Sequence, residues 1–276
     1  MTTAQKIIKY CAVAFGIFLI ITVISTVLSA GYRLLNAIGI IDSNRYSLLE
    51  NMVTISDDTE EFLSLNLDIK SSNIQIKTGD KFEVKTNNSN IKYSNENGSI
   101  KIKEDKVANW FFGKIDIGEL VIYIPENMKQ IDEVKINIGA GTVFIEQLNT
   151  KNLYLDLGAG NVAIDKLTVS EESKINGGAG NININSGEIA NVDLDLGVGN
   201  TKIKSDITGN SNINTGVGEL NLYLTLESDN YKINVNKGLG KITFNDDKIL
   251  DDTIIGNGEN YIKISGGVGN INIETK

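Results

Sequence analysis

The chain has 276 residues, enough for one large domain or two modest ones with a sizeable core. Its formal net charge of −9 argues against nucleic-acid binding, because phosphates require a basic surface. It contains no histidine, which excludes imidazole general-base catalysis and the commonest metal ligand. The single cysteine, Cys11, excludes a disulfide framework and a cysteine-type metal site. The composition therefore predicts no catalytic residue, no cofactor and no metal.

An uncharged segment near the N-terminus predicts a transmembrane helix. Residues 10–32 carry no charged side chain. As a helix rising about 1.5 Å per residue they reach roughly 34 Å, enough to cross the hydrocarbon core. Tyr10 and Tyr32 bracket the segment at the depth that amphipathic rings prefer. A cleaved signal peptide is the alternative, because the segment also has basic residues before it and small residues near its end.

Both alternatives place the rest of the chain on the same side of the membrane. Lys6 and Lys9 favour a cytoplasmic tail at residues 1–9, so the C-terminal domain is expected to be extracytoplasmic. The predicted localisation is the cell membrane, with a single span. Residues 33–59 are expected to form a linker with room for a short helix.

Residues 60–133 show a less regular alternation of apolar and polar residues, typical of β-strands that cap a larger domain. The alternating runs are 81–86, 91–93, 99–103 and 119–124. An earlier run, 67–76, matches the later repeats but has Lys70-Ser71-Ser72 where they have glycines, and is expected to form a degenerate first coil. The aromatic cluster Trp110-Phe111-Phe112 is expected to plug the end of the domain or a loop.

From residue 134 to the end, a Gly-x-Gly triplet with Ala, Val or Leu in the middle recurs seven times. The first glycines are spaced 19, 20, 19, 19, 22 and 29 residues apart, a period typical of a solenoid and too short for a propeller blade. We expect the triplets to form structural corners. The glycines are Gly139 and Gly141, Gly158 and Gly160, Gly178 and Gly180, Gly197 and Gly199, Gly216 and Gly218, Gly238 and Gly240, and Gly267 and Gly269.

Apolar and polar residues alternate on both sides of each triplet, which predicts two short strands per repeat. The position three before the first glycine and the position six after it are apolar in all seven copies. The alternation changes parity across the triplet, so the chain must bend there, and glycine supplies the positive φ that a corner needs. The middle residue, always Ala, Val or Leu, is expected to point into the core.

The predicted fold is therefore all-β. Residues 134–276 are expected to form a parallel β-solenoid whose coils of 19–22 residues stack one on the next. Exposed ends of such a stack invite aggregation, so they need protection. The N-terminal cap is expected from the preceding segment, whereas Glu274 and Lys276 are the only visible protection at the C-terminal end.

An asparagine follows the triplet in four of the seven copies, at Asn161, Asn181, Asn200 and Asn270. Asparagine tolerates left-handed backbone, and stacked side chains can bond along a column at the interstrand spacing of about 4.8 Å. The column is expected to be a structural ladder.

A second column lies two residues before each triplet. Its first five members are Asn137, Asp156, Asn176, Asp195 and Asn214. Two functional alternatives rest on it: a hard cation held by stacked oxygens, and a carboxylate-based polysaccharide-active enzyme. Both are disfavoured, because only two of the five side chains are charged and Asn176 separates these two by about 10 Å in total. A solvated face is the expected outcome.

The strand 120–125, the segment 134–141 and the repeated strand–Gly-x-Gly–strand coils resemble the bacterial DUF4097 family, whose domains carry the label "putative adhesin". The resemblance covers roughly residues 60–276. It implies a β-solenoid, frequent attachment to an N-terminal membrane segment, and no assigned catalysis.

Two hypotheses about function follow. The first is a surface-displayed, non-catalytic binding or adhesin-like module that contacts cell-wall polymer or an envelope protein. The second is an envelope-stress sensor or scaffold that regulates a membrane partner through the anchor. Neither hypothesis predicts a particular ligand.

Overall fold

The computed structural model describes residues 52–56, 61–105, 118–236 and 238–276. The predicted tail, membrane helix and short linker helix, and the aromatic cluster at 110–112, lie outside these residues. The chain divides into two units, 1–50 and 51–276, and only the second is described below. Within the described ranges no helix is long and apolar enough to cross a membrane.

The described unit is built from β-strands and one 3₁₀ turn, Ser228–Asn230 (η1). The strands are β1 (Val53–Thr54), β2 (Ser64–Ile69), β3 (Asn73–Gly79), β4 (Glu83–Thr86), β5 (Ile91–Glu96), β6 (Ser99–Glu104), β7 (Glu119–Pro125), β8 (Ile131–Ile184), β9 (Gly187–Ala190), β10 (Val192–Val198), β11 (Thr201–Thr208), β12 (Asn210–Val217), β13 (Leu220–Leu224), β14 (Tyr231–Asn236), β15 (Ile242–Phe244), β16 (Asp247–Lys248), β17 (Thr253–Ile255), β18 (Asn260–Val268) and β19 (Ile271–Thr275). The all-β prediction is confirmed.

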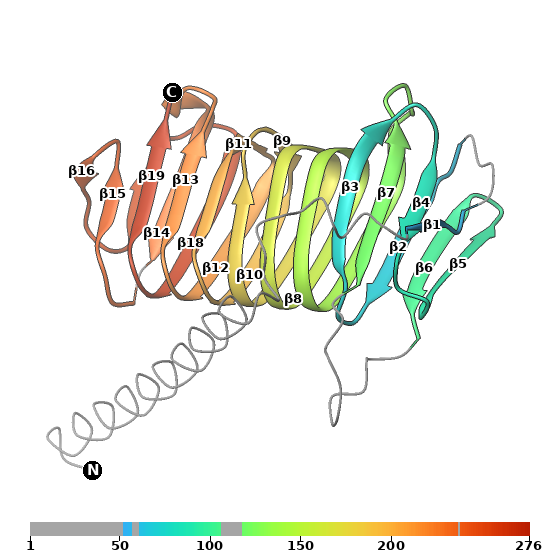
Figure 1. The fold of residues 1–276 in the computed structure, drawn as a ribbon. Coiled ribbons are helices and arrows are strands. Elements are labelled where there is room, and N and C mark those ends of the chain that lie inside the picture. Colours follow the sequence, from blue (N-terminus) through green and yellow to red (C-terminus); the bar gives the residue numbers. More distant parts are fainter. Residues whose placement is uncertain (1–51, 57–60, 106–117, 237) are drawn as a thin grey trace, which may run out of the picture. The chain divides into compact units, whose positions relative to one another are not determined.

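Two parallel ladders form the walls of a solenoid (Figure 1). Ladder A contains the strands that precede a Gly-x-Gly triplet, and ladder B contains those that follow it. In ladder A, β10 pairs in parallel with both β8 and β12; in ladder B, β11 pairs in parallel with both β8 and β13. The strand β8 is long because it runs through several coils without leaving extended geometry. The degenerate first coil is also confirmed, since β2 and β3 pair in parallel with β8.

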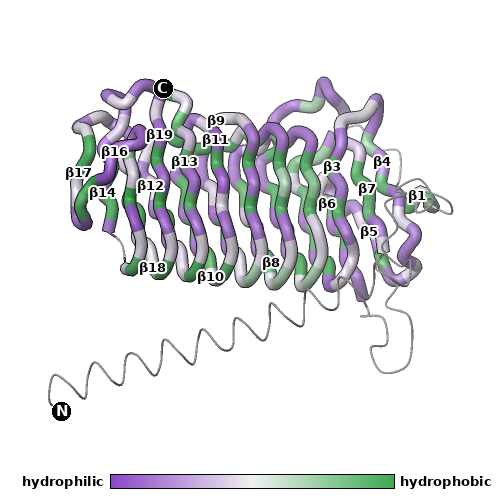
Figure 2. The backbone as a smooth tube through the Cα atoms, turned by 60° about the vertical axis from the view of Figure 1, so that its left-hand side comes forward, coloured by the Kyte–Doolittle hydropathy of each residue, from purple (hydrophilic) through white to green (hydrophobic). Residues whose placement is uncertain are grey.

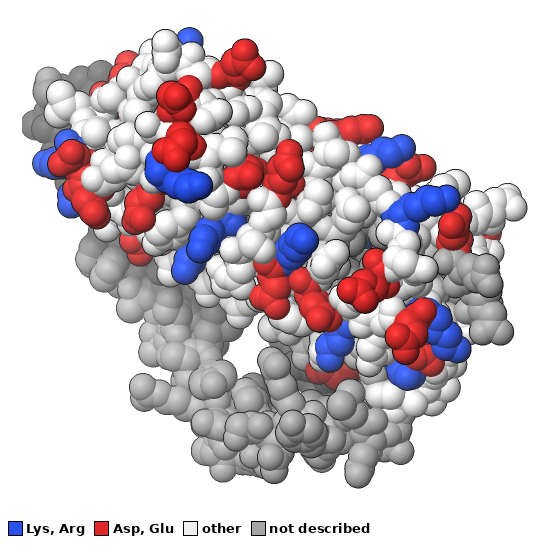
Figure 3. Space-filling view, turned by 90° about the horizontal axis from the view of Figure 1, so that it is seen from above, with Lys and Arg blue, Asp and Glu red and all other residues white. Residues whose placement is uncertain are grey.

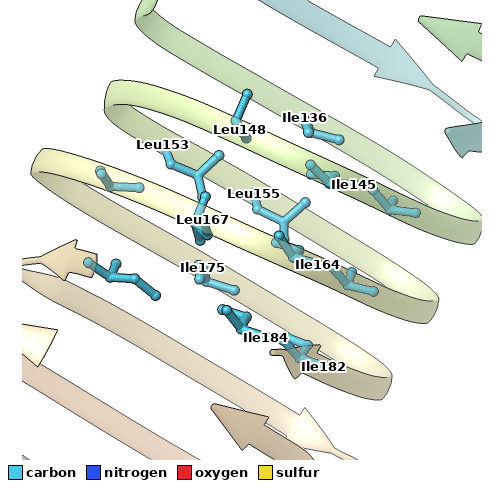
Figure 4. Packing of buried hydrophobic residues seen from close by; sticks show 14 of the residues in the cluster. Ile136, Ile145, Leu148, Leu153, Leu155, Ile164, Leu167, Ile175, Ile182 and Ile184 are labelled. Carbon is cyan, nitrogen blue, oxygen red and sulfur yellow. The ribbon is translucent and has the colours of Figure 1, made fainter. Parts of the chain in front are cut away.

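The core lies between the ladders and consists of columns of aliphatic side chains (Figure 4). Of the fourteen apolar positions three before and six after the triplets, all but Phe244 in an end coil are buried. In the middle of the solenoid, Ile175 and Ile184 are 0% exposed. Each fully buried aliphatic side chain contributes roughly 1.5–3 kcal/mol, so the stacked columns supply the main stabilisation.

The spatial order of the coils differs from their order in the chain at both ends, which corrects the expected sequential stack. At the N-terminal end, the coil β2–β3 lies between β6–β7 and the first pass of β8. At the C-terminal end, the coil β18–β19 lies between β12–β13 and β14–β15 (Figure 1). The last coil in the sequence is therefore an internal coil of the stack.

Both ends are closed by antiparallel strands. At the N-terminal end, β5 pairs with β6, β4 pairs with β7, and β1 pairs with β4. At the C-terminal end, β17 pairs with β14 and β16 pairs with β15. These short strands cover the parallel edges that would otherwise template aggregation. The expectation that Glu274 and Lys276 protect the C-terminal end is wrong, because β19 has neighbours on both sides.

Candidate functional site

The second glycine of each triplet makes the corner. These glycines have φ between +142° and +149°, a region that side chains other than glycine rarely adopt. Stacking adds a second restriction, because a Cβ on Gly180 would overlap the carbonyl oxygen of Gly160 in the next coil. The first glycine of each triplet does not have a positive φ. It is restricted only by the backbone of the adjacent coil, which lies too close for a Cβ. The φ argument from sequence therefore applies to one glycine of each pair.

The middle residue of each triplet points outward, which corrects the expectation that it faces the core. Val198, Val268 and Leu239 are 42%, 50% and 69% exposed. We call this line of side chains the apolar ridge. In spatial order it contains Ala140, Ala159, Ala179, Val198, Val217, Val268 and Leu239. The corners that carry it lie along the lower edge of the solenoid in Figure 2. Its residues change from Ala to Val to Leu toward the C-terminal end of the solenoid.

A polar row runs parallel to the apolar ridge on ladder A. It consists of the outward residues two positions before the triplets. In spatial order these are Asp68, Asn137, Asp156, Asn176, Asp195, Asn214, Ser265 and Asn236. Carboxylate and amide alternate over its first six members. The Asn214 amide donates to Asp195 Oδ1 at 2.7 Å.

The polar row borders a shallow groove, which we call the corner groove, and the residues between this row and the first glycines, such as Leu157 and Leu196, also line it. Its floor is the line of first glycines, which present bare backbone, and over the middle four coils it has a volume of about 600 Å³. Asp156, Asn176, Asp195 and Asn214 line it. Gly177 occupies a position where the adjacent coils carry Leu157 and Leu196. The groove thus follows the solenoid axis beside the polar row, and the apolar ridge begins one residue after the glycines of its floor.

The opposite edge of the solenoid has a different character. Seen from above in Figure 3, it carries acidic and basic side chains interspersed. Many are paired, as in the ion pair between Lys151 Nζ and Asp132 Oδ1 at 2.7 Å, which raises the pKa of Lys151. On ladder A beside the polar row, the Tyr154 hydroxyl donates to Glu172 at 2.9 Å, and this bond raises the pKa of Tyr154. Compared with this edge, the corner groove is sparsely charged.

The asparagine column lies on the ladder B side of the corner and bonds coil to coil. Asn161 Oδ1 accepts from the backbone N–H and the side-chain amide of Asn181 at 3.1 and 3.0 Å. Asn181 and Asn200 accept in the same way from the backbone N–H of Asn200 and Glu219. Asn270 Oδ1 accepts from the backbone N–H of Lys241 in the end coil at 3.1 Å.

Sequence reasoning missed one further member of this column. Asn73 follows Lys70-Ser71-Ser72, which lacks glycine, yet its Oδ1 accepts from the backbone N–H of Thr142 at 3.1 Å. The match of 67–76 to the later coils was the available signal. Each of these amide oxygens accepts a hydrogen bond from a backbone N–H of the adjacent coil. The asparagine side chains therefore serve a structural role.

The arrangement brings together no catalytic or metal-binding constellation that the residues suggest. Asp156 and Asp195 lie on opposite sides of Asn176, about 10 Å apart at the interstrand spacing. Among the residues that the structure describes, no three acidic or cysteine side chains gather where they could hold a metal ion. What the corner groove offers is a repeated set of hydrogen-bonding groups beside an apolar border.

The Toastrack DUF4097 family model matches residues 62–255 of the chain. The chain belongs to this family. Its fold is β-solenoid-like, in agreement with the ladders described above. The matched region includes the cap strands except β1 and ends just before β18, the first strand of the inserted last coil.

Three solved structures are similar to the chain at low sequence identity. A "putative cell adhesion protein" from Clostridium sporogenes is 20% identical and has a TM-score of 0.39, over 82% of this chain and 98% of that one. A "putative adhesin" from Bacteroides fragilis is 15% identical with a TM-score of 0.40, over 83% and 99% of the two chains. A "putative lipid binding protein" from Parabacteroides distasonis is 13% identical with a TM-score of 0.37, over 81% and 97%. No curated protein matches the chain.

Proposed function

We propose that this Toastrack protein is a membrane-anchored, non-catalytic binding module of the cell envelope, and that it binds its ligand along the corner groove. The corner groove itself carries the proposal. Its polar row repeats the same groups at every second coil, and its glycine floor lets a ligand approach the backbone closely. The absence of histidine from the sequence fits a role in binding better than one in catalysis.

The repetition favours an extended ligand that lies along the solenoid axis. Carboxylates accept hydrogen bonds from hydroxyl groups, and amides both donate and accept. The net charge of −9 and the aspartates of the polar row disfavour an anionic polymer. A neutral, hydroxyl-rich polymer of the cell wall fits these groups, with its less polar face against the apolar ridge.

The decisive test compares two aspartates of the same strand. Asp195 lines the corner groove, whereas Asp193, two residues earlier on β10, faces outward beyond it. Sedimentation with purified cell wall should show binding by the unaltered chain, at least a tenfold loss in Asp156→Ala/Asp195→Ala, and no loss in Asp193→Ala. Two hydrogen bonds to charged groups, at about 1.5–3 kcal/mol each, support this magnitude. Equal binding by all three proteins would refute the groove as the site.

The proposed location depends on the uncharged segment 10–32, which would anchor the module with its solenoid outside the membrane. Labelling of intact cells with an impermeant maleimide tests this. A cysteine at position 276 in a Cys11→Ala background should react without lysis. If it and a second cysteine at the exposed Leu250 both stay silent until lysis, the envelope proposal fails.

A second candidate function is regulation of a membrane partner, favoured by the apolar ridge. Leu239 and Val268 are neighbours on it and expose large apolar surface at one end of the solenoid. Leu239→Ser/Val268→Ser should then abolish co-purification of a membrane protein while binding to cell wall persists. Loss of wall binding alone would favour the first function.

A further inference from the structure

The coil β18–β19, which we call the C-terminal coil, fills a slot between two coils that precede it in the chain. On ladder A, Ile262 of β18 pairs with Ser211 of β12 on one side and with Ile233 of β14 on the other. On ladder B, Ile271 of β19 pairs with Leu220 and Ile242 in the same manner. Both walls of the slot are therefore synthesised before the coil that separates them.

The two walls of the slot are matched to each other as well as to the C-terminal coil. Val217 and Leu239, the corner residues of the two walls, pair with Val268 from opposite sides. A Cβ on Gly238 would overlap Gly267, and one on Gly267 would overlap Gly216, so all three corners share one stack. Each wall would accept any coil with this strand–Gly-x-Gly–strand pattern.

The coil is nevertheless held firmly once it is in place. Ile262, Ile264 and Ile273 are 0% exposed. The Asn272 amide donates to Glu219 at 2.8 Å and to Asn221 at 2.9 Å on one wall, and its Oδ1 accepts from Thr243 at 2.8 Å on the other. A slot left empty would expose apolar columns and two rows of unpaired backbone groups.

One connection, residues 256–259, joins the C-terminal coil to the rest of the described solenoid. Gly256 has φ of +71°, and Asn257 and Glu259 are exposed. The coil β2–β3 has only the cap strand β1 before it, and the remaining coils have described solenoid strands both before and after them in the chain. Within the described residues, the C-terminal coil can therefore leave its slot, or enter another, by rotation about a single short connection without threading.

We propose that the C-terminal coil is exchanged between two copies of this chain, each copy filling the slot of the other with its own residues 260–275. The contacts in an exchanged pair are the same as those within one copy, so exchange changes only the connection and the entropy of association. Because the residues of both walls precede the C-terminal coil in the chain, the coil of a neighbouring copy can take its place between them. The partner is a second copy of this chain, and this proposal is independent of the proposed function.

Cross-linking between two differently tagged full-length chains tests the exchange. Asn214 and Ser265 are neighbours across the slot boundary. One chain carries Asn214→Cys and the other Ser265→Cys, both in a Cys11→Ala background. After co-expression and mild oxidation, exchange predicts a disulfide-linked heterodimer. The double variant with both cysteines in one chain reports whether the geometry allows the bond, and Asn236→Cys with Ser265→Cys is a second pair across the other boundary.

A matched pair from the interior of the solenoid provides the control. Asn176 and Asp195 are neighbours on the same polar row, but their coils have solenoid on both sides in the chain. Chains with Asn176→Cys and Asp195→Cys should give no heterodimer. Heterodimers from both pairs would indicate lateral contact between solenoids and refute exchange. Cross-links only in the single-chain double variants, with none between chains, would show that each coil stays in its own slot.

Discussion

The first corner of the solenoid and the seven later ones both lead from ladder A to ladder B, but with different backbone conformations and different chemistry. Each glycine corner has a positive φ at its second glycine, whereas Lys70, Ser71 and Ser72 have none. At a glycine corner the N–H of Gly199 donates to a backbone carbonyl, that of Val217, at 2.9 Å. At the first corner, the N–H groups of Lys70 and Ser71 donate to one carboxylate, Glu104 Oε2, at 2.8 and 2.9 Å. Glu104 ends β6, the outer neighbour of β2, and is 1% exposed.

Glu104 is surrounded by further donors. Its Oε1 accepts from the Asn88 amide at 2.8 Å and from the Ser71 hydroxyl at 3.2 Å. The Glu104 carboxylate accepts the hydrogen bonds that backbone carbonyls of an adjacent coil accept at the glycine corners. Its five donors, which include the Ser72 hydroxyl, offset the free-energy cost of burying its charge. A corner therefore needs satisfied N–H groups, and residues other than glycine can form one where no positive φ is adopted.

The largest expected effect lies in the interior glycine corners. Gly180→Ala places a Cβ against the carbonyl oxygen of Gly160 at a φ of +146°, so it should cost more than about 4 kcal/mol of the free energy of unfolding. Gly141→Ala, in the glycine corner that stacks on the first corner, should cost clearly less, because its Cβ would lie 2.8 Å from the carbonyl oxygen of Ser72. Denaturant titration of both variants measures the difference. Equal losses would show that φ alone sets the requirement.

Loss of the Glu104 carboxylate should have the next largest effect. Glu104→Ala leaves buried N–H groups of Lys70 and Ser71 without an acceptor and should cost about 3–5 kcal/mol. Glu104→Gln keeps one acceptor oxygen and should cost less. Glu96→Ala removes an exposed carboxylate on the adjacent strand β5 and should change stability by under about 1 kcal/mol. If Glu96→Ala and Glu104→Ala were equivalent in the same titration, the capping role would be refuted.

The C-terminal end differs from the N-terminal end in burying a phenol rather than a carboxylate. Tyr231 is 1% exposed, and burial raises its pKa from 10.0 to about 12. Because the pKa of Tyr231 is higher in the folded chain, the folded state holds this proton more tightly than the unfolded state. The resulting stabilisation is complete below about pH 10 and is lost as the pH rises toward 12, by up to about 3 kcal/mol. Thermal melts from pH 8 to 12 should show this loss, and Tyr231→Phe should reduce it. An unchanged alkaline loss in that variant would assign the effect to other groups.

The smallest expected effect concerns the asparagine column. Asn181→Ala removes the acceptor for the backbone N–H of Asn200 and the side-chain amide bond to Asn161, and should cost about 1 kcal/mol. Asn212→Ala is the matched control, since Asn212 is exposed on ladder A outside the column. A difference below about 0.3 kcal/mol between these variants in denaturant titration would count against a stabilising ladder.

Much of the fold follows from local pattern. Alternation on either side of each triplet identified the strands, and the change of parity at Gly178 and its equivalents located the corner. The direction of the middle residue did not follow, because the corner geometry turns Val198 outward while the flanking alternation suggested an inward position. The corner groove was missed because it depends on the stacking of the polar row and the first glycines of four coils, which only the tertiary structure shows.

The sequence by itself determined the coil: its length, its two strands, its glycine corner and the buried columns, because these depend on contacts that every coil repeats. Only the tertiary structure decided the order of the coils. The glycine coils share one register and one corner, so a coil that can stack on one of them can stack on any other. The spacing of 29 residues before Gly267 was the sole local sign of the displaced last coil. The need to close both edges with antiparallel strands then selected one order.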